Sequence, residues 1–144
     1  MRRAAKLASM PSRDRILLLR AVFLLGSAFV LLRLFNWNAA LRRFSHAVAK
    51  SRGTGGQPSP ERITWAVRAV STRLPLVNNC LVQSLALRSL LAQHGYASEL
   101  RIGVAQPTQR KLDAHAWVER EGRVLIGEKT AGGFTPLTFP KADG

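Results

Sequence analysis

The sequence predicts an α+β fold in which N-terminal helices precede a small antiparallel sheet. Up to Gly95, apolar residues recur at helical spacing, and the segments begin and end at capping residues. After Gly95, apolar and polar residues alternate, and Gly122 marks a tight turn between two alternating segments. The single cysteine, Cys80, stands where the last predicted helix begins. The sequence therefore places a thiol at the start of the helix that precedes the sheet-forming half.

Composition indicates one domain with a real core, in a reducing compartment. The chain has 144 residues, of which 47% are hydrophobic, and one cysteine cannot form an internal disulfide. We therefore expect a cytoplasmic protein. The net charge of +14 suggests an anionic partner. The arginines are scattered and no zinc-finger or RNA-binding signature is present, so nucleic acid is not the expected partner.

The first predicted helix, residues 16–32 with Asp14 in its first turn, is apolar almost all round. Its charge-free run covers only residues 21–32, between Arg20 and Arg33. Because a membrane span needs about 20 apolar residues, we favour a helix that packs in a protein interface. A span, or a contact with a membrane surface through snorkelling arginines, stays open. A signal peptide is disfavoured, since the apolar run starts late and no small-residue cleavage site follows.

A linker divides the chain. Residues 39–50 are predicted as a second helix, and residues 51–60 are rich in Gly, Ser and Pro. We expect an N-terminal helical region and linker over residues 1–59, and a core domain over residues 60–144. The core should open with a helix capped by Ser59, with Pro60 at its first position.

The cysteine helix follows. Asn78 or Asn79 is its predicted N-cap, and Gly95 provides the left-handed stop after His94. A thiol in the first turn faces unpaired backbone N–H groups and the positive end of the helix dipole, which both favour the thiolate. The alternative is a small buried hydrophobic residue, as many lone cysteines are.

Three strands are predicted, at residues 99–104, 113–119 and 123–128. A two-residue turn at Glu121-Gly122 would place Trp117 opposite Ile126 and His115 opposite Glu128. Opposed residues have Cβ atoms about 4.5–5.5 Å apart, so the carboxylate of Glu128 could orient the imidazole. Asp113, two residues before His115 on the same face, is a rival with poorer reach.

Several sequence blocks together resemble the leader peptidases of lasso peptide biosynthesis, which belong to the transglutaminase-like cysteine protease superfamily. The blocks are residues 79–91, Gly95-Tyr96, residues 101–104, residues 114–119 and Gly122. The similarity covers roughly residues 60 to 130, and the N-terminal helices resemble those of the stand-alone peptidases. The resemblance implies a transglutaminase- or papain-like core in which the cysteine helix packs on the sheet.

The resemblance also implies residue assignments and partners. Cys80 matches the nucleophile and His115 the base. The acid is usually an aspartate on the strand after the histidine, so Glu128 on that strand departs from the pattern and Asp113 stays an alternative. The substrate would be a ribosomally made lasso precursor peptide. Residues 1–59 are too short for a fused leader-recognition domain, which implies a separate recognition protein. An ATP-dependent cyclase would take the cleaved peptide, and no cofactor or metal is expected.

The chemistry expected is thiol-mediated peptide hydrolysis. The backbone N–H of Cys80 would form part of an oxyanion hole, with Asn78, Asn79 or Gln83 as candidates for a second donor. Two other classes of function fit the same fold. One is a non-catalytic peptide-binding module, against which the joint presence of Cys80 and His115 argues. The other is an acyltransferase or amidase, which only substrate tests separate from a peptidase.

Overall fold

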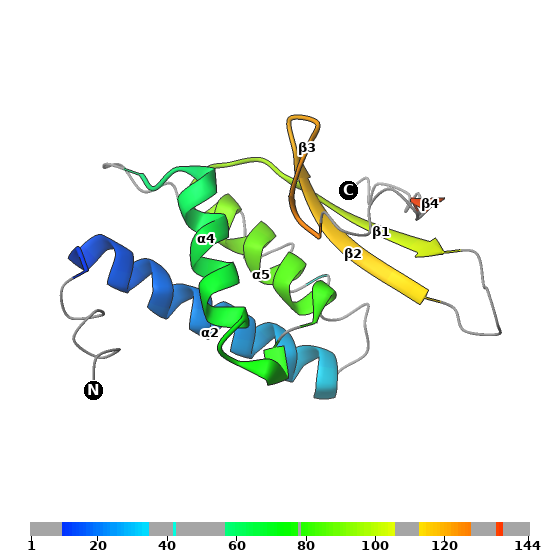
Figure 1. The fold of residues 1–144 in the computed structure, drawn as a ribbon, viewed down its shortest axis with the longest axis horizontal. Helices are drawn as coiled ribbons and strands as arrows, with labels where there is room; N and C mark the ends of the chain where they lie inside the picture. The colour runs from blue at the N-terminus through cyan, green and yellow to red at the C-terminus, as the bar shows by residue number, and fades with distance from the viewer. Residues whose placement is uncertain are drawn as a thin grey trace.

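The structure, a computed structural model, describes residues 10–34, 42, 57–77, 79–105, 113–127 and 135–136. It is α+β, as the sequence predicts: a layer of helices lies against one side of an antiparallel sheet (Figure 1). The predicted second helix at residues 39–50 and the Gly-rich part of the linker lie outside the described residues, apart from Arg42. The division after residue 59 therefore stays a prediction. The N-terminal helix α2 (Ser12–Leu34) packs into the same core as the later helices.

Helix α2, Ser12–Leu34, is longer than predicted and has two apolar faces. One face is buried against α4 and α5, which agrees with the expectation that the helix packs within the protein. The other face is exposed, with Phe23 at 72% and Leu34 at 70%. By length and composition α2 could also cross a membrane, since its mean hydropathy reaches 2.1. Figure 1 shows it as the blue helix beneath α4 and α5.

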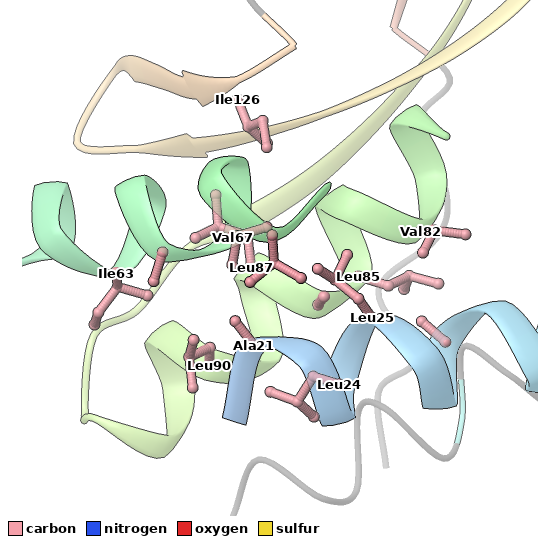
Figure 2. Packing of buried hydrophobic residues seen from close by; sticks show 14 of the residues in the cluster. Ala21, Leu24, Leu25, Ile63, Val67, Val82, Leu85, Leu87, Leu90 and Ile126 are labelled. Carbon is pink, nitrogen blue, oxygen red and sulfur yellow. The ribbon is translucent and has the colours of Figure 1, made fainter. Parts of the chain in front are cut away.

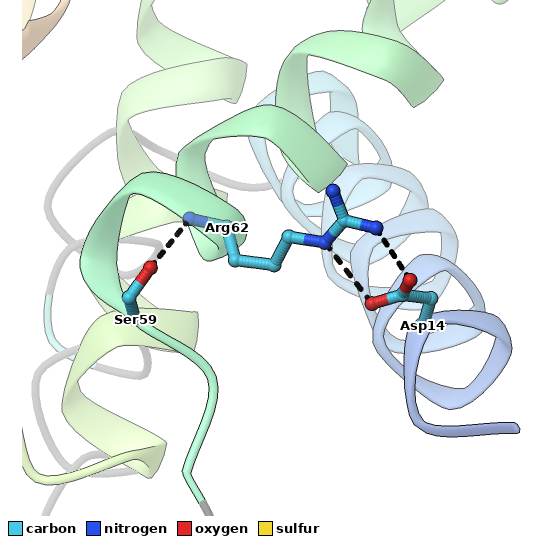
Figure 3. A network of polar contacts seen from close by, with 3 residues as sticks. All are labelled: Asp14, Ser59 and Arg62. Carbon is cyan, nitrogen blue, oxygen red and sulfur yellow. Dashed lines mark hydrogen bonds and ion pairs between the residues drawn. The ribbon is translucent and has the colours of Figure 1, made fainter. Parts of the chain in front are cut away.

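Helix α4, Pro60–Ser71, begins as predicted. The Ser59 hydroxyl accepts a hydrogen bond from the Arg62 backbone N–H at 3.3 Å, and Pro60 occupies the first turn. The helix ends at the Thr72 cap, and a short 3-10 turn, η2 (Pro75–Val77), follows. Figure 3 shows the Arg62 guanidinium paired with the Asp14 carboxylate, which joins the start of α4 to the start of α2.

Helix α5, Cys80–Gln93, is capped at both ends by local sequence. The Asn79 side chain accepts a hydrogen bond from the Leu81 N–H at 2.9 Å, so Asn79 is the N-cap. At the other end Gly95 has a φ of 78°, and the Tyr96 N–H donates to the Leu91 carbonyl. The Gly95 N–H also donates to the Ala92 carbonyl. The two hydrogen bonds form a Schellman motif, which satisfies carbonyls that a helix end leaves unpaired. The predicted limits of the cysteine helix are thus confirmed.

The described strands are β1 (Glu99–Ala105), β2 (Asp113–Arg120), β3 (Arg123–Ile126) and the two-residue β4 (Thr135–Pro136). They lie in the order β3-β2-β1-β4, and the paired strands are antiparallel. The sheet is therefore three strands with a minimal fourth at the edge of β1. The tight turn between β2 and β3 uses Glu121 and Gly122, both with positive φ, as the sequence predicts.

The predicted register of the β2–β3 hairpin is wrong beyond its first two pairs. Glu119 faces Val124 as predicted, but Val118, and not Trp117, faces Ile126. The register shifts because Leu125 is an extra residue in β3, a β-bulge. A bulge leaves a backbone group outside the ladder, and here the Leu125 carbonyl accepts a hydrogen bond from Arg68 of α4 at 2.7 Å. The predicted pair of His115 with Glu128 depended on an uninterrupted register, and Glu128 itself lies outside the described residues.

The core lies between the helical layer and one face of the sheet. Figure 2 shows side chains of α2, α4 and α5 interleaved, with Ile126 of β3 pointing toward them. Val118 of β2 is completely buried in the same cluster. Its largest fully buried members are Leu25, Ile63, Val67, Leu85, Leu87, Leu90, Leu91 and Val118. Most of these side chains come from the helices, so the helical layer provides most of the core.

Candidate active site

Cys80 is the first residue of α5 and is half-buried. The Asn79 side chain caps the next N–H, that of Leu81, and the Asn79 carbonyl accepts the Gln83 N–H at 2.9 Å. The Cys80 N–H belongs to the first turn, where no carbonyl four residues back in the helix can accept it. The cap therefore leaves this N–H available beside its own thiol, as an oxyanion hole requires. Asn78, another candidate donor, lies outside the described residues.

His115 lies on β2, directly opposite Gly103 of β1. Because Gly103 has no side chain, the imidazole has no cross-strand side chain beside it on that strand. The His115 Nε2 lies 3.4 Å from the Gly127 carbonyl oxygen, just after β3. The imidazole also stacks with the Trp117 ring, with centroids 6.4 Å apart and planes 19° apart. The ring is thus held by groups of the sheet itself.

Trp117 and Glu119 extend this arrangement along the same face of β2, since alternate residues of a strand share a face. Trp117 is 2% exposed, and its Nε1 donates a hydrogen bond to Glu119 Oε1 at 2.7 Å. Glu119 Oε2 in turn lies 3.5 Å from Arg101 Nε of β1, and Arg101 also pairs with Glu99 at 2.7 Å. A chain of polar contacts therefore fixes the indole against which His115 stacks.

Gly127 is a close fit behind His115 and Trp117. Its φ is 91°, a region that side chains with a Cβ rarely adopt. A Cβ at this position would lie 2.7 Å from the Trp117 Cβ and 3.2 Å from the His115 Nε2. Any residue other than glycine would therefore displace the indole, the imidazole or the backbone between them.

Cys80 and His115 stand on elements in direct contact, because α5 packs against β2 (Figure 1). Within the part of the chain that the structure describes, no side-chain hydrogen bond joins the two residues. Val118 faces the helical layer, so His115, which is three residues away along β2, projects to the other face of the sheet. The structure brings the two candidate groups to neighbouring elements but does not show a formed thiol–imidazole pair.

The other two histidines are poor candidates for the base. His46 lies outside the described residues. His94 caps the C-terminal end of α5, about 20 Å from Cys80 along a helix of 14 residues. Burial, together with the Arg20 charge, holds the pKa of His94 below its usual value of 6.5, so its ring is neutral at pH 7. Within the described chain, position therefore favours His115.

Neither candidate acid is settled by the described side chains. Asp113 is the first residue of β2, two residues before His115. Glu128 follows Gly127 directly in the sequence, and the Gly127 carbonyl already lies beside the imidazole. Both acids stay candidates for the third catalytic group.

The roles of Trp117, Glu119 and Gly127 beside His115 are not predicted from the sequence. The alternation in residues 113–119 does contain part of the signal, since His115, Trp117 and Glu119 are spaced two apart. The position of Gly127 could not be predicted, because it depends on the bulge in β3.

A surface groove lies elsewhere, between α4 and β3. Its lining residues include Trp65, Arg68, Arg73, Arg123 and Leu125. Cys80 and His115 are not among its lining residues. Among the described residues, no group of three or more His, Cys, Asp or Glu is arranged to hold a metal ion.

Comparison with known proteins identifies the domain. A family profile described as the transglutaminase-like superfamily matches residues 22–138. The match includes Cys80, His115 and both candidate acids, together with most of α2. Searches of curated proteins and of solved structures returned no match. Because the profile covers most of the 144 residues, and the helix-then-sheet order of the structure agrees with it, the chain belongs to the transglutaminase-like superfamily.

Proposed function

We propose that the protein is a cysteine peptidase that removes the leader from a lasso precursor peptide during its maturation. The single observation that carries the proposal is the position of Cys80. It is the first residue of α5, it lies within a transglutaminase-like domain, and α5 packs against the strand that bears His115. This superfamily includes cysteine peptidases. The motif resemblance described above supports the narrower substrate assignment.

The proposed reaction is acyl transfer to a thiol followed by hydrolysis. The Cys80 thiolate attacks the carbonyl carbon of the last leader residue, and the C–N bond breaks as His115 protonates the departing amine. Water, deprotonated by His115, then attacks the thioester and releases the leader as a carboxylic acid. The Cys80 N–H would stabilise the oxyanion in both steps. In the structure His115 projects from the face of β2 opposite to the helices, so a thiol–imidazole contact would require the bound precursor to reorient the imidazole or the start of α5.

The proposal includes a third group and partners. Glu128 is the favoured acid, because its neighbour Gly127 already contacts His115, and Asp113 is the alternative. A separate leader-recognition protein would deliver the precursor, since α2 packs into the core of this domain. An ATP-dependent cyclase would act on the released core peptide, in the cytoplasm.

The test is cleavage of precursor by the Cys80→Ala variant in the presence of the recognition protein. We expect complete loss of cleavage with precursor binding largely retained, because the thiol supplies covalent chemistry and little affinity. Mass spectrometry should find, for the wild type, two products whose masses sum to the precursor plus one water. A product that has gained an amine instead would identify an acyltransferase.

The single cysteine provides an independent control. Iodoacetamide can alkylate only Cys80 as a thiol, so it should inactivate the wild type in proportion to the fraction modified. Circular dichroism of Cys80→Ala should match the wild type. Cleavage that persists in the variant, or after full alkylation, would refute a cysteine peptidase.

A further inference from the structure

Helix α2 carries a second apolar face that the domain does not use. Its buried face packs on α4 and α5, through Leu17, Ala21, Leu24, Leu25 and Ala28. Five large apolar side chains on the opposite side are between 48% and 72% exposed; we call them the exposed stripe: Ile16, Leu19, Phe23, Val30 and Leu34. At about 100° per residue, these five lie within about 60° of the helix circumference. They lie along one side of the helix in two groups, Ile16, Leu19 and Phe23 in its first half and Val30 and Leu34 at its end.

Arginines border the exposed stripe on both sides. By the same helical spacing, Arg13 and Arg20 lie along one edge, and Arg15 and Arg33 lie along the other. The side chains are exposed at these four positions. Asp14 is the single acidic residue of α2, and its carboxylate pairs with Arg62 of α4. Among the described residues, no acidic side chain pairs with these four arginines, so the solvent-facing side of α2 combines apolar groups with positive charge.

We propose that the exposed stripe docks α2 flat on an anionic phospholipid bilayer. The exposed stripe would enter the boundary between headgroups and acyl chains, and the bordering arginines would reach the phosphates. A shallow groove beside the stripe, lined by Ile16, Leu19, Arg20 and Phe23 among others, offers apolar walls next to a guanidinium. The net charge of +14 favours the same partner, because anionic surfaces attract basic proteins.

A lipid surface fits these observations better than a partner protein. A specific protein interface would need complementary acids for each arginine. The headgroups of an anionic bilayer supply negative charge next to every arginine that borders the exposed stripe. A membrane span does not fit. It would remove the buried face of α2, including fully buried Ala21 and Leu25, from the domain core. Docking in the plane of the membrane leaves that core intact and uses only side chains that are already exposed. This inference does not depend on the proposed peptidase activity.

Flotation of the full-length protein with vesicles tests the proposal. Binding should be clear with mixed phosphatidylcholine–phosphatidylglycerol vesicles, weak with phosphatidylcholine alone, and reduced by added salt. The double variant Leu19→Gln/Phe23→Gln should lower the partition coefficient by about tenfold or more, since two large apolar side chains lose their burial. Leu74→Gln, at an apolar residue exposed elsewhere, is the matched control and should bind as the wild type does.

A second pair of variants tests the charge. Arg15→Gln/Arg33→Gln should weaken binding to anionic vesicles, whereas Arg73→Gln/Arg123→Gln, which removes the same charge elsewhere, should weaken it less. Equal binding to neutral and anionic vesicles, or equal losses in the two pairs, would overturn the proposal. Sodium carbonate should release the protein from membranes, and retention would indicate a span instead. A dimer in size-exclusion chromatography that Leu19→Gln/Phe23→Gln dissolves, without vesicle binding, would show that a second copy covers the stripe.

Discussion

The two faces of strand β2 differ in the kind of side chain they present. The face toward the helices carries Val118, which is completely buried among apolar groups. The other face carries His115, Trp117 and Glu119, which are linked by ring stacking and by a hydrogen bond. The first face holds the domain together through non-directional burial. The second face places an imidazole by directional contacts, so changes on the two sides should have separable effects on stability and on activity.

The largest effect should come from the acid that orients His115. Glu128→Gln keeps the size of the side chain but removes its charge, so with Glu128 as the proposed acid the imidazolium would lose its stabilising partner. By analogy with other catalytic triads, we expect the single-turnover cleavage rate to fall by one to several orders of magnitude, up to about 10⁴. Asp113→Asn should cost much less, and Glu128→Asp should keep more activity than the amide. A severe loss in Asp113→Asn with a mild one in Glu128→Gln would instead identify Asp113 as the acid.

Truncation of a core residue in the helical layer should lower the free energy of unfolding without changing the cleavage rate of the folded protein. Leu87 is completely buried in α5, so Leu87→Ala should lower the free energy of unfolding by about 2–5 kcal/mol. Urea denaturation measures this loss, and Leu74→Ala, at an exposed residue, should change it little. The folded fraction of Leu87→Ala should cleave at the wild-type rate. A large rate defect per folded molecule would mean that the two faces are not separable.

Gly127 directly follows β3, two residues after the bulge at Leu125. Gly122, in the turn of the same hairpin, is its matched control. Gly127 and Gly122 both have positive φ, but only at Gly127 would a Cβ meet other atoms closely. Gly122→Ala should cost about 1–2 kcal/mol from backbone strain. Gly127→Ala should cost about 1–3 kcal/mol more from overpacking, and it should also slow cleavage by displacing His115. Equal losses of stability in thermal or urea unfolding would argue against the close fit at Trp117.

The smallest effect concerns the ion pair that joins α2 to α4. The hydrogen bonds from Arg62 hold the pKa of Asp14 below its usual value of 3.8. A carboxyl group with a lower pKa in the folded state stabilises the protein above its unfolded-state pKa, and this stabilisation is lost as pH falls through the folded-state pKa. The melting temperature of the wild type should therefore exceed that of Asp14→Asn slightly at pH 7, and the two should converge below about pH 4. A difference that does not change with pH would refute an electrostatic origin.

The parts of the fold that follow from local chemistry could be predicted from the sequence. The caps at Ser59 and Asn79 and the stop at Gly95 each depend on residues within a few positions, and the structure confirms all three. The bulge at Leu125 could not be predicted, because it is stabilised by Arg68, 57 residues away. The register of β3, and with it the surroundings of His115, depends on that distant contact.

The candidate site also contains one part that local sequence predicts and one part that depends on distant contacts. Cys80 could be placed at a helix start because Asn79 and Gly95 define that helix by themselves. The neighbours of His115 could not be placed, since they come from β1 and from the residue after β3. Trp117, which the predicted register only placed opposite Ile126, provides the surface on which the imidazole stacks.

The way in which α2 is held against α4 and α5 determines whether the segment that joins α2 to α4 can change in length. Its position depends on its buried face and on the pair of Asp14 with Arg62, residues 48 apart in sequence. The entropy cost of closing a flexible loop grows only logarithmically, by about 0.6 kcal/mol for each doubling of length. That cost is small beside the burial of even one large side chain, about 1.5–3 kcal/mol. Insertions or deletions in the predicted linker before Ser59 should therefore be tolerated, with α2 kept in the same place on α4 and α5.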